Sequence, residues 1–190
     1  MNYDFECIQI IPDISKESSG PSYSVVKLAE NLIEHLAIQL TGSTTVSFDG
    51  KDIDLSAPWR RATMVELIEE QTGHVVSLET SVGELRNLCS QYDIEVQPSY
   101  GPGKLILELY EKTVEANIWN PCFVTEYPKE VSPLSRDHRD KDGFTERFEG
   151  IIAGREILNG FSELVDSEEQ MERFKDQLEK GKSGDEEAMG

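Results

Sequence analysis

Apolar side chains recur along the chain with two periods, and each period predicts one type of element. Steps of three and four residues predict helices over residues 21–41, 63–73, 80–91, 103–116 and 166–180. Short apolar runs bounded by turn residues predict strands over 5–11 and 123–127, and two hairpins over 44–55 and 146–164. Hairpins interspersed with helices indicate an α+β fold, with an antiparallel β-sheet and flanking helices.

Local signals mark where several of these elements begin or turn. Asp49-Gly50 between two alternating runs is typical of a two-residue hairpin turn. The patterns Thr63-Met-Val-Glu66 and Asp166-Ser-Glu-Glu169 are typical of capping boxes, which open helices. The polar segment 132–144 is expected to form a mobile loop before the second hairpin.

Charge and cysteine usage narrow the class of protein. The chain has 37 acidic and 18 basic residues, a net charge of −19, so by itself it is not expected to bind nucleic acids or anionic membranes in general. Its three cysteines, Cys7, Cys89 and Cys122, are widely spaced and show no metal-binding spacing, which indicates reduced thiols in a cytoplasmic protein. The sequence starts without a signal-peptide pattern, and its apolar runs are shorter than the roughly 20 residues needed to cross a bilayer.

The second hairpin combines core-like apolar residues with carboxylates. If its turn lies at Ile152–Ala153, Glu149 faces Glu156 across the strand pair. Two carboxylates at that separation are solvated, share a proton or share a cation, because like charges directly opposite destabilise a sheet. Mg²⁺ prefers carboxylate oxygens and usually binds together with phosphate, so it is the candidate cation.

Three further residues of this hairpin suggest an organic ligand. Asn159, Phe161 and Glu163 alternate along an extended strand and therefore share one face. An amide, an aromatic ring and a carboxylate in a row suit a ligand with a polar head, an aliphatic stem and a cationic end. Glu156 belongs to the opposite face by strict alternation, and a bulge near Gly160 would reconcile the two groups. The competing interpretation is a solvated strand face in an acidic protein, and the chemistry alone favours it.

Two longer motifs carry a resemblance to a known family. The runs FVTEYPKEVSPLS and ERFEGIIAGREILNGFSELVDSEEQMERF resemble class II lysyl-tRNA synthetases over most of residues 120–175, and weaker similarity extends over about 23–189. The resemblance implies that residues 23–180 are part of a class II aminoacyl-tRNA synthetase catalytic domain. It leaves 1–22 as a poorly matched N-terminal segment and 181–190 as a polar tail.

The resemblance also implies roles for the residues of the second hairpin. Glu149 and Glu156 match the carboxylates that hold Mg²⁺ around the ATP phosphates. Asn159 matches the amide that contacts the amino-acid substrate, Phe161 the ring that packs on the lysine stem, and Glu163 the acid that pairs with the ε-ammonium group. No residue is assigned a catalytic role.

Other family features fall at or beyond the ends of this chain. Glu6 matches a further contact to the ε-ammonium group, in a segment where isoleucines replace the expected tyrosines. The anticodon-binding domain, the motif 1 interface of the family's homodimer, most of motif 2 and the whole of motif 3 have no counterpart in these residues. Lysine, ATP and tRNA-Lys are the implied partners, with tRNA contacted through the missing parts, and independent activity of the isolated chain is in doubt.

Three functions are consistent with this resemblance. The first is a segment of a lysine–tRNA ligase, an enzyme that uses ATP to activate lysine to lysyl-adenylate and transfers it to tRNA-Lys. The alternative is a non-catalytic synthetase paralogue that acts as a lysine-binding or protein-interaction module. A third is a lysyltransferase resembling the one that modifies elongation factor P, which also lacks the anticodon domain.

Overall fold

Five strands form the central sheet of the protein. The structure is a computed structural model that describes the backbone of residues 8–9 and 21–182 and the side chains of 25–175. The sheet has the order β1-β7-β6-β5-β4. Its strands are β1 (Ile8–Gln9), β4 (Arg60–Thr63), β5 (Cys122–Thr125), β6 (Arg147–Ile152) and β7 (Arg155–Phe161). A separate two-stranded sheet consists of β2 (Thr45–Phe48) and β3 (Lys51–Asp54).

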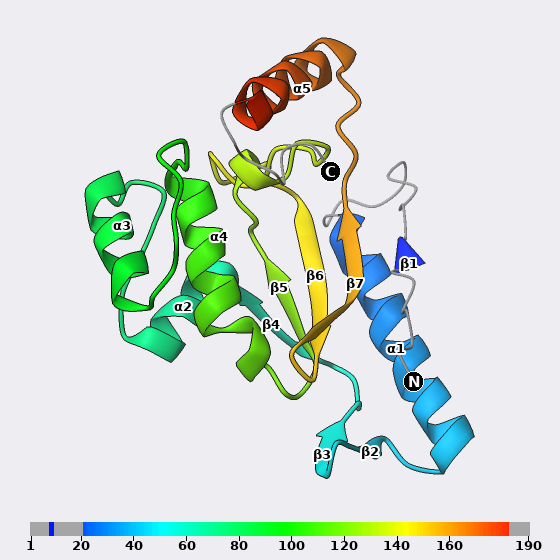
Figure 1. Cartoon of the computed structure of the whole chain (residues 1–190). Coiled ribbons are helices and arrows are strands. Elements are labelled where there is room, and N and C mark those ends of the chain that lie inside the picture. The colour runs from blue at the N-terminus through cyan, green and yellow to red at the C-terminus, as the bar shows by residue number, and fades with distance from the viewer. Residues whose placement is uncertain (1–7, 10–20, 183–190) are drawn as a thin grey trace.

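The helices flank the sheet on both sides, as Figure 1 shows. They are α1 (Pro21–Thr41), α2 (Met64–Thr72), α3 (Val82–Gln91), α4 (Pro102–Thr113) and α5 (Ser167–Lys182), with short 3-10 turns η1 (Glu115–Asn117) and η2 (Lys129–Val131). The predicted α+β fold with an antiparallel sheet and flanking helices is confirmed. None of the helices in the described part of the chain is long and apolar enough to cross a membrane.

The sheet pairing is antiparallel in the middle and parallel at both edges. The β5–β6 and β6–β7 pairs are antiparallel, whereas β4 joins β5 and β1 joins β7 in parallel. Strand β4 was not predicted because its sequence, Arg-Arg-Ala-Thr, is polar and its partner is distant in the chain. The two arginines of β4 pair with acids, Arg60 with Glu70 at 2.5 Å and Arg61 with Glu30 at 2.9 Å.

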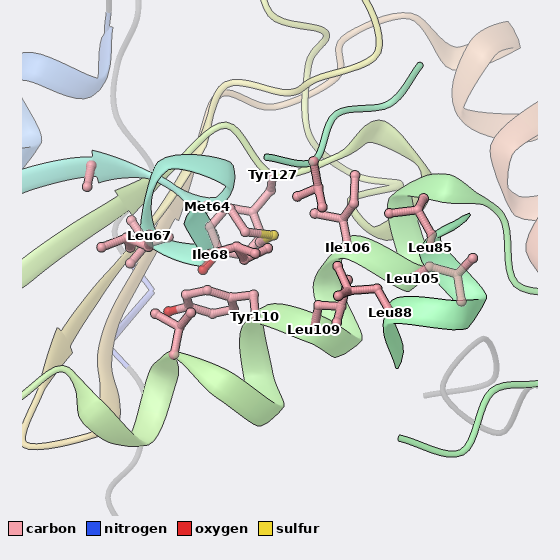
Figure 2. Packing of buried hydrophobic residues seen from close by; sticks show 14 of the residues in the cluster. Met64, Leu67, Ile68, Leu85, Leu88, Leu105, Ile106, Leu109, Tyr110 and Tyr127 are labelled. Atoms are coloured by element: carbon pink, nitrogen blue, oxygen red, sulfur yellow. The ribbon is translucent and has the colours of Figure 1, made fainter. Parts of the chain in front are cut away.

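Two apolar clusters cover opposite faces of the sheet. The larger lies among α2, α3 and α4 (Figure 2), and it includes the fully buried Met64, Ile68, Leu85 and Leu105. On this face the sheet contributes the residues Ala62, Cys122, Val124 and Ile151. The smaller cluster joins α1 to the other face, through Val25, Val26, Ala29, Trp59, Phe123, Phe148 and Leu158. The α2–α4 side is therefore the thicker layer, and α1 is a single helix against the opposite side.

Most predicted helix ends match the structure. Thr63 forms a complete capping box with Glu66, and α2 ends at Gly73, which has a φ of 76°. At α5 the Asp166 carboxylate accepts hydrogen bonds from the backbone N–H groups of Glu168 and Glu169, as predicted. The Glu169 carboxylate, however, contacts Lys129 and Arg173.

Segment 132–144, expected to be a mobile loop, is attached at several points. Isolated bridges pair Ser135 with Glu163 and Asp137 with Thr145, and Ser135 is buried. These attachments are backbone pairings with other segments of the chain, which the polar composition of the segment alone does not reveal.

Candidate functional site

The β6–β7 hairpin contains most of the predicted site residues. Its turn is formed by Ala153 and Gly154, with φ values of 52° and 68°. Glu149 is paired with Asn159, and Glu156 with Ile151. The predicted pairing of Glu149 with Glu156 is therefore wrong, because the turn lies one residue later than assumed.

A bulge in β7 nevertheless brings the two carboxylates to one face. The register shifts between Gly150 and Ile151, so Ile157 is the extra residue of β7. Because one extra residue reverses the alternation, Glu156 shares a face with Glu149 and Asn159. Ile157 and Leu158 both contact the cluster on the α1 side. The predicted bulge exists, but at Ile157 rather than near Gly160.

Gly160 has a packing role on the α1 side. A Cβ atom there would lie 2.5 Å from Cζ of Phe148, so the ring occupies the space above this glycine. Phe148 in turn makes an edge-on contact with Phe123, with centroids 5.6 Å apart. This glycine allows close aromatic packing behind the candidate site.

The tip of the hairpin is fixed to the segment after α4. The Ala153 N–H donates to the Trp119 carbonyl at 2.9 Å, and the Gly154 N–H donates to the Ile118 carbonyl at 2.7 Å. A Cβ atom on Gly154 would lie 2.9 Å from the Ala116 carbonyl oxygen. These contacts hold the turn, and hence the register of Glu156, against a neighbouring element.

Glu149 is a buried carboxylate with a cationic neighbour. It is 7% exposed, and its Oε1 accepts a hydrogen bond from Arg147 at 2.6 Å. Burial raises the pKa of Glu149, the Arg147 guanidinium opposes that shift, and the negative charge of Glu156 adds to it. Arg147 also lies over the Tyr127 ring, 4.6 Å from its centroid. The guanidinium thereby compensates the buried charge and is itself oriented by an aromatic face.

A third acid belongs to the same neighbourhood. Burial raises the pKa of Glu115, in η1, and the charge of Glu156 raises it further. Among the described residues, no group of three or more His, Cys, Asp or Glu side chains is arranged to hold a metal ion. Glu149 and Glu156, the carboxylates that the resemblance assigns to Mg²⁺, share one face of the hairpin, an arrangement that fits an ion whose other ligands are phosphates and water.

The predicted ligand row continues from the same face. Asn159 and Phe161 are half-buried, and Phe161 is paired with Arg147. Among the described residues, the buried Oδ1 atom of Asn159 has no hydrogen-bond partner. Glu163 is exposed and lies just after β7, in a bridge with Ser135. The structure thus places Asn159 and Phe161 on the face of Glu149, with Glu163 beyond the strand end, and Glu6 lies outside the described residues.

Sequence reasoning missed two buried tyrosines beside Glu149. Tyr110 of α4 and Tyr127 are each 1% exposed, and side-chain interactions link Tyr127 to Glu149 and Tyr110 to Tyr127. Burial raises the pKa of both hydroxyls, and the charge of Glu149 contributes to each shift. Tyr127 falls within the TEYP motif, which gave the resemblance but no role for this residue. Arg147, two residues before Glu149, was detectable by strand alternation.

The candidate site residues are separate from two clefts of the described structure. The clefts, of about 420 and 450 Å³, lie elsewhere, one beside α2 and the 114–122 segment and the other against α3. No predicted site residue among those described lines either cleft. These two clefts are therefore separate from the predicted site residues of the hairpin.

Comparison with known proteins identifies the family. Residues 17–189 match the family model described as "tRNA synthetases class II (D, K and N)". The lysine–tRNA ligase of Porphyromonas gingivalis strain W83 is 41% identical over 165 residues, which are 87% of this chain and 28% of that protein. The lysine–tRNA ligase of Xanthomonas oryzae pv. oryzae is 41% identical over 174 residues, 91% of this chain and 34% of that protein.

A relative from a third organism gives the same result. The lysine–tRNA ligase of Neisseria gonorrhoeae strain NCCP11945 is 39% identical over 166 residues, 87% of this chain and 33% of that protein. The chain spans about a third of the length of the curated relatives it matches. The resemblance expected from the two sequence motifs is therefore confirmed, and the chain belongs to the class II tRNA synthetases of the D, K and N group.

Proposed function

We propose that this chain forms the face of a lysine–tRNA ligase catalytic domain that binds lysine and Mg-ATP. The observation that carries this proposal is the bulge at Ile157, which gives Glu149, Glu156 and Asn159 one common face. The competing interpretation, a solvated strand face, does not account for the Glu149 carboxylate, because this residue is only 7% exposed.

The lysine part of the site follows β7 toward its carboxyl end. Glu163 is exposed and would pair with the ε-ammonium group of lysine. The half-buried ring of Phe161 would pack on the aliphatic stem. The Asn159 amide would contact the polar head of the amino acid, and its buried Oδ1 atom has no other partner among the described residues. A shorter or uncharged side chain would leave the Glu163 carboxylate without its partner.

The metal part of the site lies nearer the hairpin tip. Glu149 and Glu156 would hold Mg²⁺, which binds in proteins through one or two carboxylates and the phosphates of its nucleotide. When bound, the ion would neutralise phosphate charge near these acids. Arg147 already donates to Glu149 and would keep that carboxylate oriented.

The proposed activity is that of the lysine–tRNA ligases to which the chain is similar. Lysine would be activated with ATP to lysyl-adenylate and transferred to tRNA-Lys, in the cytoplasm, by a homodimer. The ligase activity is that of relatives of which this chain spans about a third, and the adenylate, the cytoplasmic location and the homodimer are what the family resemblance implies. The isolated chain is proposed only to keep the lysine and Mg-ATP contacts described above.

Ligand-dependent melting of the purified chain tests this proposal. We would measure Tm alone, with Mg-ATP, with lysine, and with arginine as a matched cationic control. Lysine at a hundredfold excess over Kd would add about 2.7 kcal/mol to the free energy of unfolding. We expect lysine to raise Tm, arginine to raise it less, and the E163Q variant to lose the difference.

The remaining outcomes separate the alternatives. Equal stabilisation by lysine and arginine, or none by either, would contradict the proposed lysine site. Stabilisation by lysine without stabilisation by Mg-ATP would favour the non-catalytic paralogue, whereas stabilisation by both ligands would support the proposed lysine and Mg-ATP contacts. Lysine-dependent exchange of pyrophosphate into ATP that the E156A variant abolishes would favour an active enzyme.

A further inference from the structure

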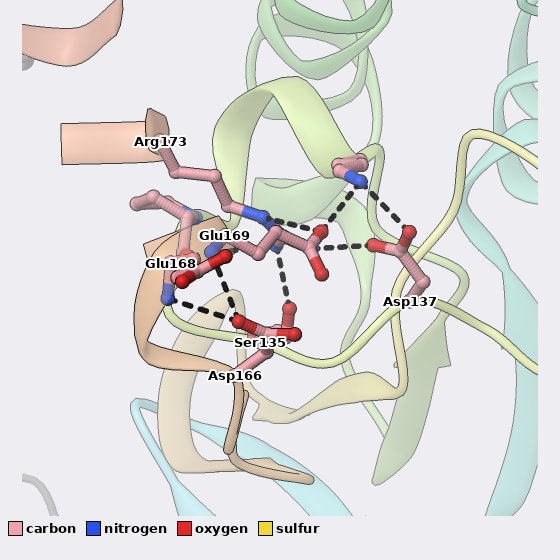
Figure 3. Close-up of polar contacts among 8 residues, drawn as sticks. Ser135, Asp137, Asp166, Glu168, Glu169 and Arg173 are labelled. Atoms are coloured by element: carbon pink, nitrogen blue, oxygen red, sulfur yellow. Dashed lines mark hydrogen bonds and ion pairs between the residues drawn. The ribbon is translucent and has the colours of Figure 1, made fainter. Parts of the chain in front are cut away.

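Four charged side chains connect α5 to the segment that follows β5. Arg173 of α5 donates to Asp137 at 2.6 Å and to Glu169 at 2.5 Å. Lys129 of η2 contacts the same two acids, Asp137 at 2.7 Å and Glu169 at 2.9 Å. Figure 3 shows Asp137, Glu169 and Arg173 close together between the helix and the loop. We call Lys129, Asp137, Glu169 and Arg173 the α5 clamp.

Arg173 is the member of the α5 clamp that reaches into the loop backbone. Its side chain is buried, with 8% exposure, and its Nη1 donates to the Ser135 carbonyl at 2.8 Å. Ser135 itself is 2% exposed. A buried carbonyl that loses its donor is costly, so the position of Ser135 depends on Arg173.

Ser135 in turn pairs with Glu163, the residue proposed to select lysine. Residues on both sides of Ser135 form hydrogen bonds with residues on both sides of Glu163. The Arg136 N–H donates to the Ser162 carbonyl at 2.7 Å, and the Leu164 N–H donates to the Leu134 carbonyl at 3.1 Å. Because Glu163 lies after the end of β7, this short pairing is what holds its backbone.

We propose that Arg173 is a positioning residue for lysine selectivity, acting through Ser135 on the backbone of Glu163. This inference rests on the proposed role of Glu163 as the partner of the ε-ammonium group. An exposed carboxylate on an unsupported segment would sample many orientations, and the α5 clamp restricts them. Loss of Arg173 therefore weakens the discrimination for the ε-ammonium group more than the binding of the aliphatic stem.

The first test measures positioning without any ligand. Amide hydrogen exchange of the whole chain would be compared between wild type and the R173M variant. We expect hydrogen exchange at Arg136 and Leu164 to become about tenfold faster. Without the Arg173 donor, local opening of the pairing between Ser135 and Glu163 should become about ten times more frequent. Amides in the β5–β6 pair should keep their rates. Unchanged rates at Arg136 and Leu164 would overturn the inference, whatever the chain binds.

The chain offers a matched control for this substitution. Arg86 of α3 also donates to backbone carbonyls of a loop, those of Gln97 and Pro98 at 3.0 Å each, and it lies outside the candidate site. The R86M variant removes the same chemistry elsewhere. It should leave the exchange of Arg136 and Leu164 unchanged, so a general loss of stability would be recognised.

The second test compares lysine with norleucine, which has the same stem but lacks the ε-ammonium group. We expect R173M to reduce the ratio of the two affinities about tenfold while norleucine binding changes little. R173K, which keeps one charged donor, should restore part of the ratio, and R173M should have no further effect on it in the E163Q background. Equal losses for both ligands would indicate a merely structural role and overturn the inference. A wild-type chain that does not prefer lysine to norleucine would instead contradict the proposed function. The amide hydrogen exchange of Arg136 and Leu164 would still decide whether Arg173 positions Glu163.

Discussion

The two hairpins of this protein have the same turn and different surroundings. In β2–β3 the turn residues Asp49 and Gly50 have φ values of 49° and 76°, and in β6–β7 Ala153 and Gly154 have 52° and 68°. Both are two-residue turns with positive φ at each position, a geometry that suits the twist of paired strands. The turn geometry alone therefore does not explain why one hairpin carries the candidate site.

Burial and register distinguish the two hairpins. In β2 and β3, both described in full, Ile53 alone is buried, and the pairing is regular from Thr45 to Asp54. In β6 four of six residues are buried, and β7 contains the bulge that aligns Glu156 with Glu149. The candidate site thus lies on the hairpin whose irregular register is fixed by tertiary contacts.

Trp119 connects the two hairpins. Its indole Nε1 donates to the Asp52 carbonyl at 3.0 Å, and Lys51 lies over its ring, 4.6 Å from the centroid. Its backbone carbonyl accepts the hydrogen bond from Ala153 of the other hairpin. The side chain therefore supports the exposed hairpin and the backbone supports the buried one.

Matched glycine substitutions should separate the hairpins most strongly. Gly50 and Gly154 both have positive φ, so alanine at either position costs about 1 kcal/mol of backbone strain. A Cβ atom on Gly50 meets no described atom within 4 Å, whereas one on Gly154 would lie 2.9 Å from the Ala116 carbonyl oxygen. We expect G50A to lower the free energy of unfolding by about 1 kcal/mol and G154A by about 3 kcal/mol.

Equilibrium urea unfolding of both variants would check this difference. The comparison requires unchanged m-values, because a changed slope would report a change in compactness rather than in stability. Equal losses for the two variants would mean that the segment from Ala116 to Trp119 yields to the hairpin tip and does not fix it.

The carboxylates of the two hairpins should respond to pH in opposite directions. Burial raises the pKa of Glu149 above its ordinary 4.5. Between pH 4.5 and this raised pKa, the folded state therefore binds more protons than the unfolded state. Stability relative to the E149Q variant should therefore fall as pH rises from about 4.5 through the raised pKa, with a slope of at most about 1.4 kcal/mol per pH unit.

Asp54 of β3 gives the opposite sign. Its carboxylate accepts a hydrogen bond from the Ser56 N–H at 3.0 Å, which lowers its pKa below 3.8. Stability relative to the D54N variant should persist above pH 3.8 and decline as pH falls through the lowered pKa. Urea midpoints measured across this range would show both trends. If the stability of the wild type relative to E149Q rose with pH, the buried state of Glu149 would be contradicted.

The turns explain how much of the site could be predicted from the sequence. Asp49-Gly50 is a strong turn signal, and the first hairpin was predicted with its correct turn. Ala153-Gly154 is a weaker signal because alanine seldom adopts positive φ. The Ile118 and Trp119 carbonyls impose that conformation, and they belong to a segment more than 30 residues earlier in the chain. The predicted turn was therefore one residue too early, which displaces the partner of Ile151 by two residues and, with the bulge, that of Glu149 by three, although the hairpin itself was found.

In the rest of the fold, too, local signals predicted elements correctly and contacts between distant segments were missed. Helices α1 to α4 were found because their apolar periods and caps are local, as in the capping box of Thr63. Strand β4 was missed because its pairing with β5 is parallel and distant. The residues matched to the family lie on one hairpin, but the support that Arg147 and Arg173 give them arises only when segments meet in space.

Trp119 gives the smallest and most local prediction. The W119F variant keeps an aromatic ring beside Lys51 and the backbone bond to Ala153, but it loses the indole bond to Asp52. An exposed neutral hydrogen bond contributes about 1 kcal/mol, equivalent to roughly a fivefold change in local opening. Amide exchange in β2 and β3 should therefore become about fivefold faster, while exchange in β6 and β7 stays unchanged. If exchange in both hairpins becomes faster, the indole must also support the candidate site, and the contrast between an independent exposed hairpin and a fixed buried one would no longer hold.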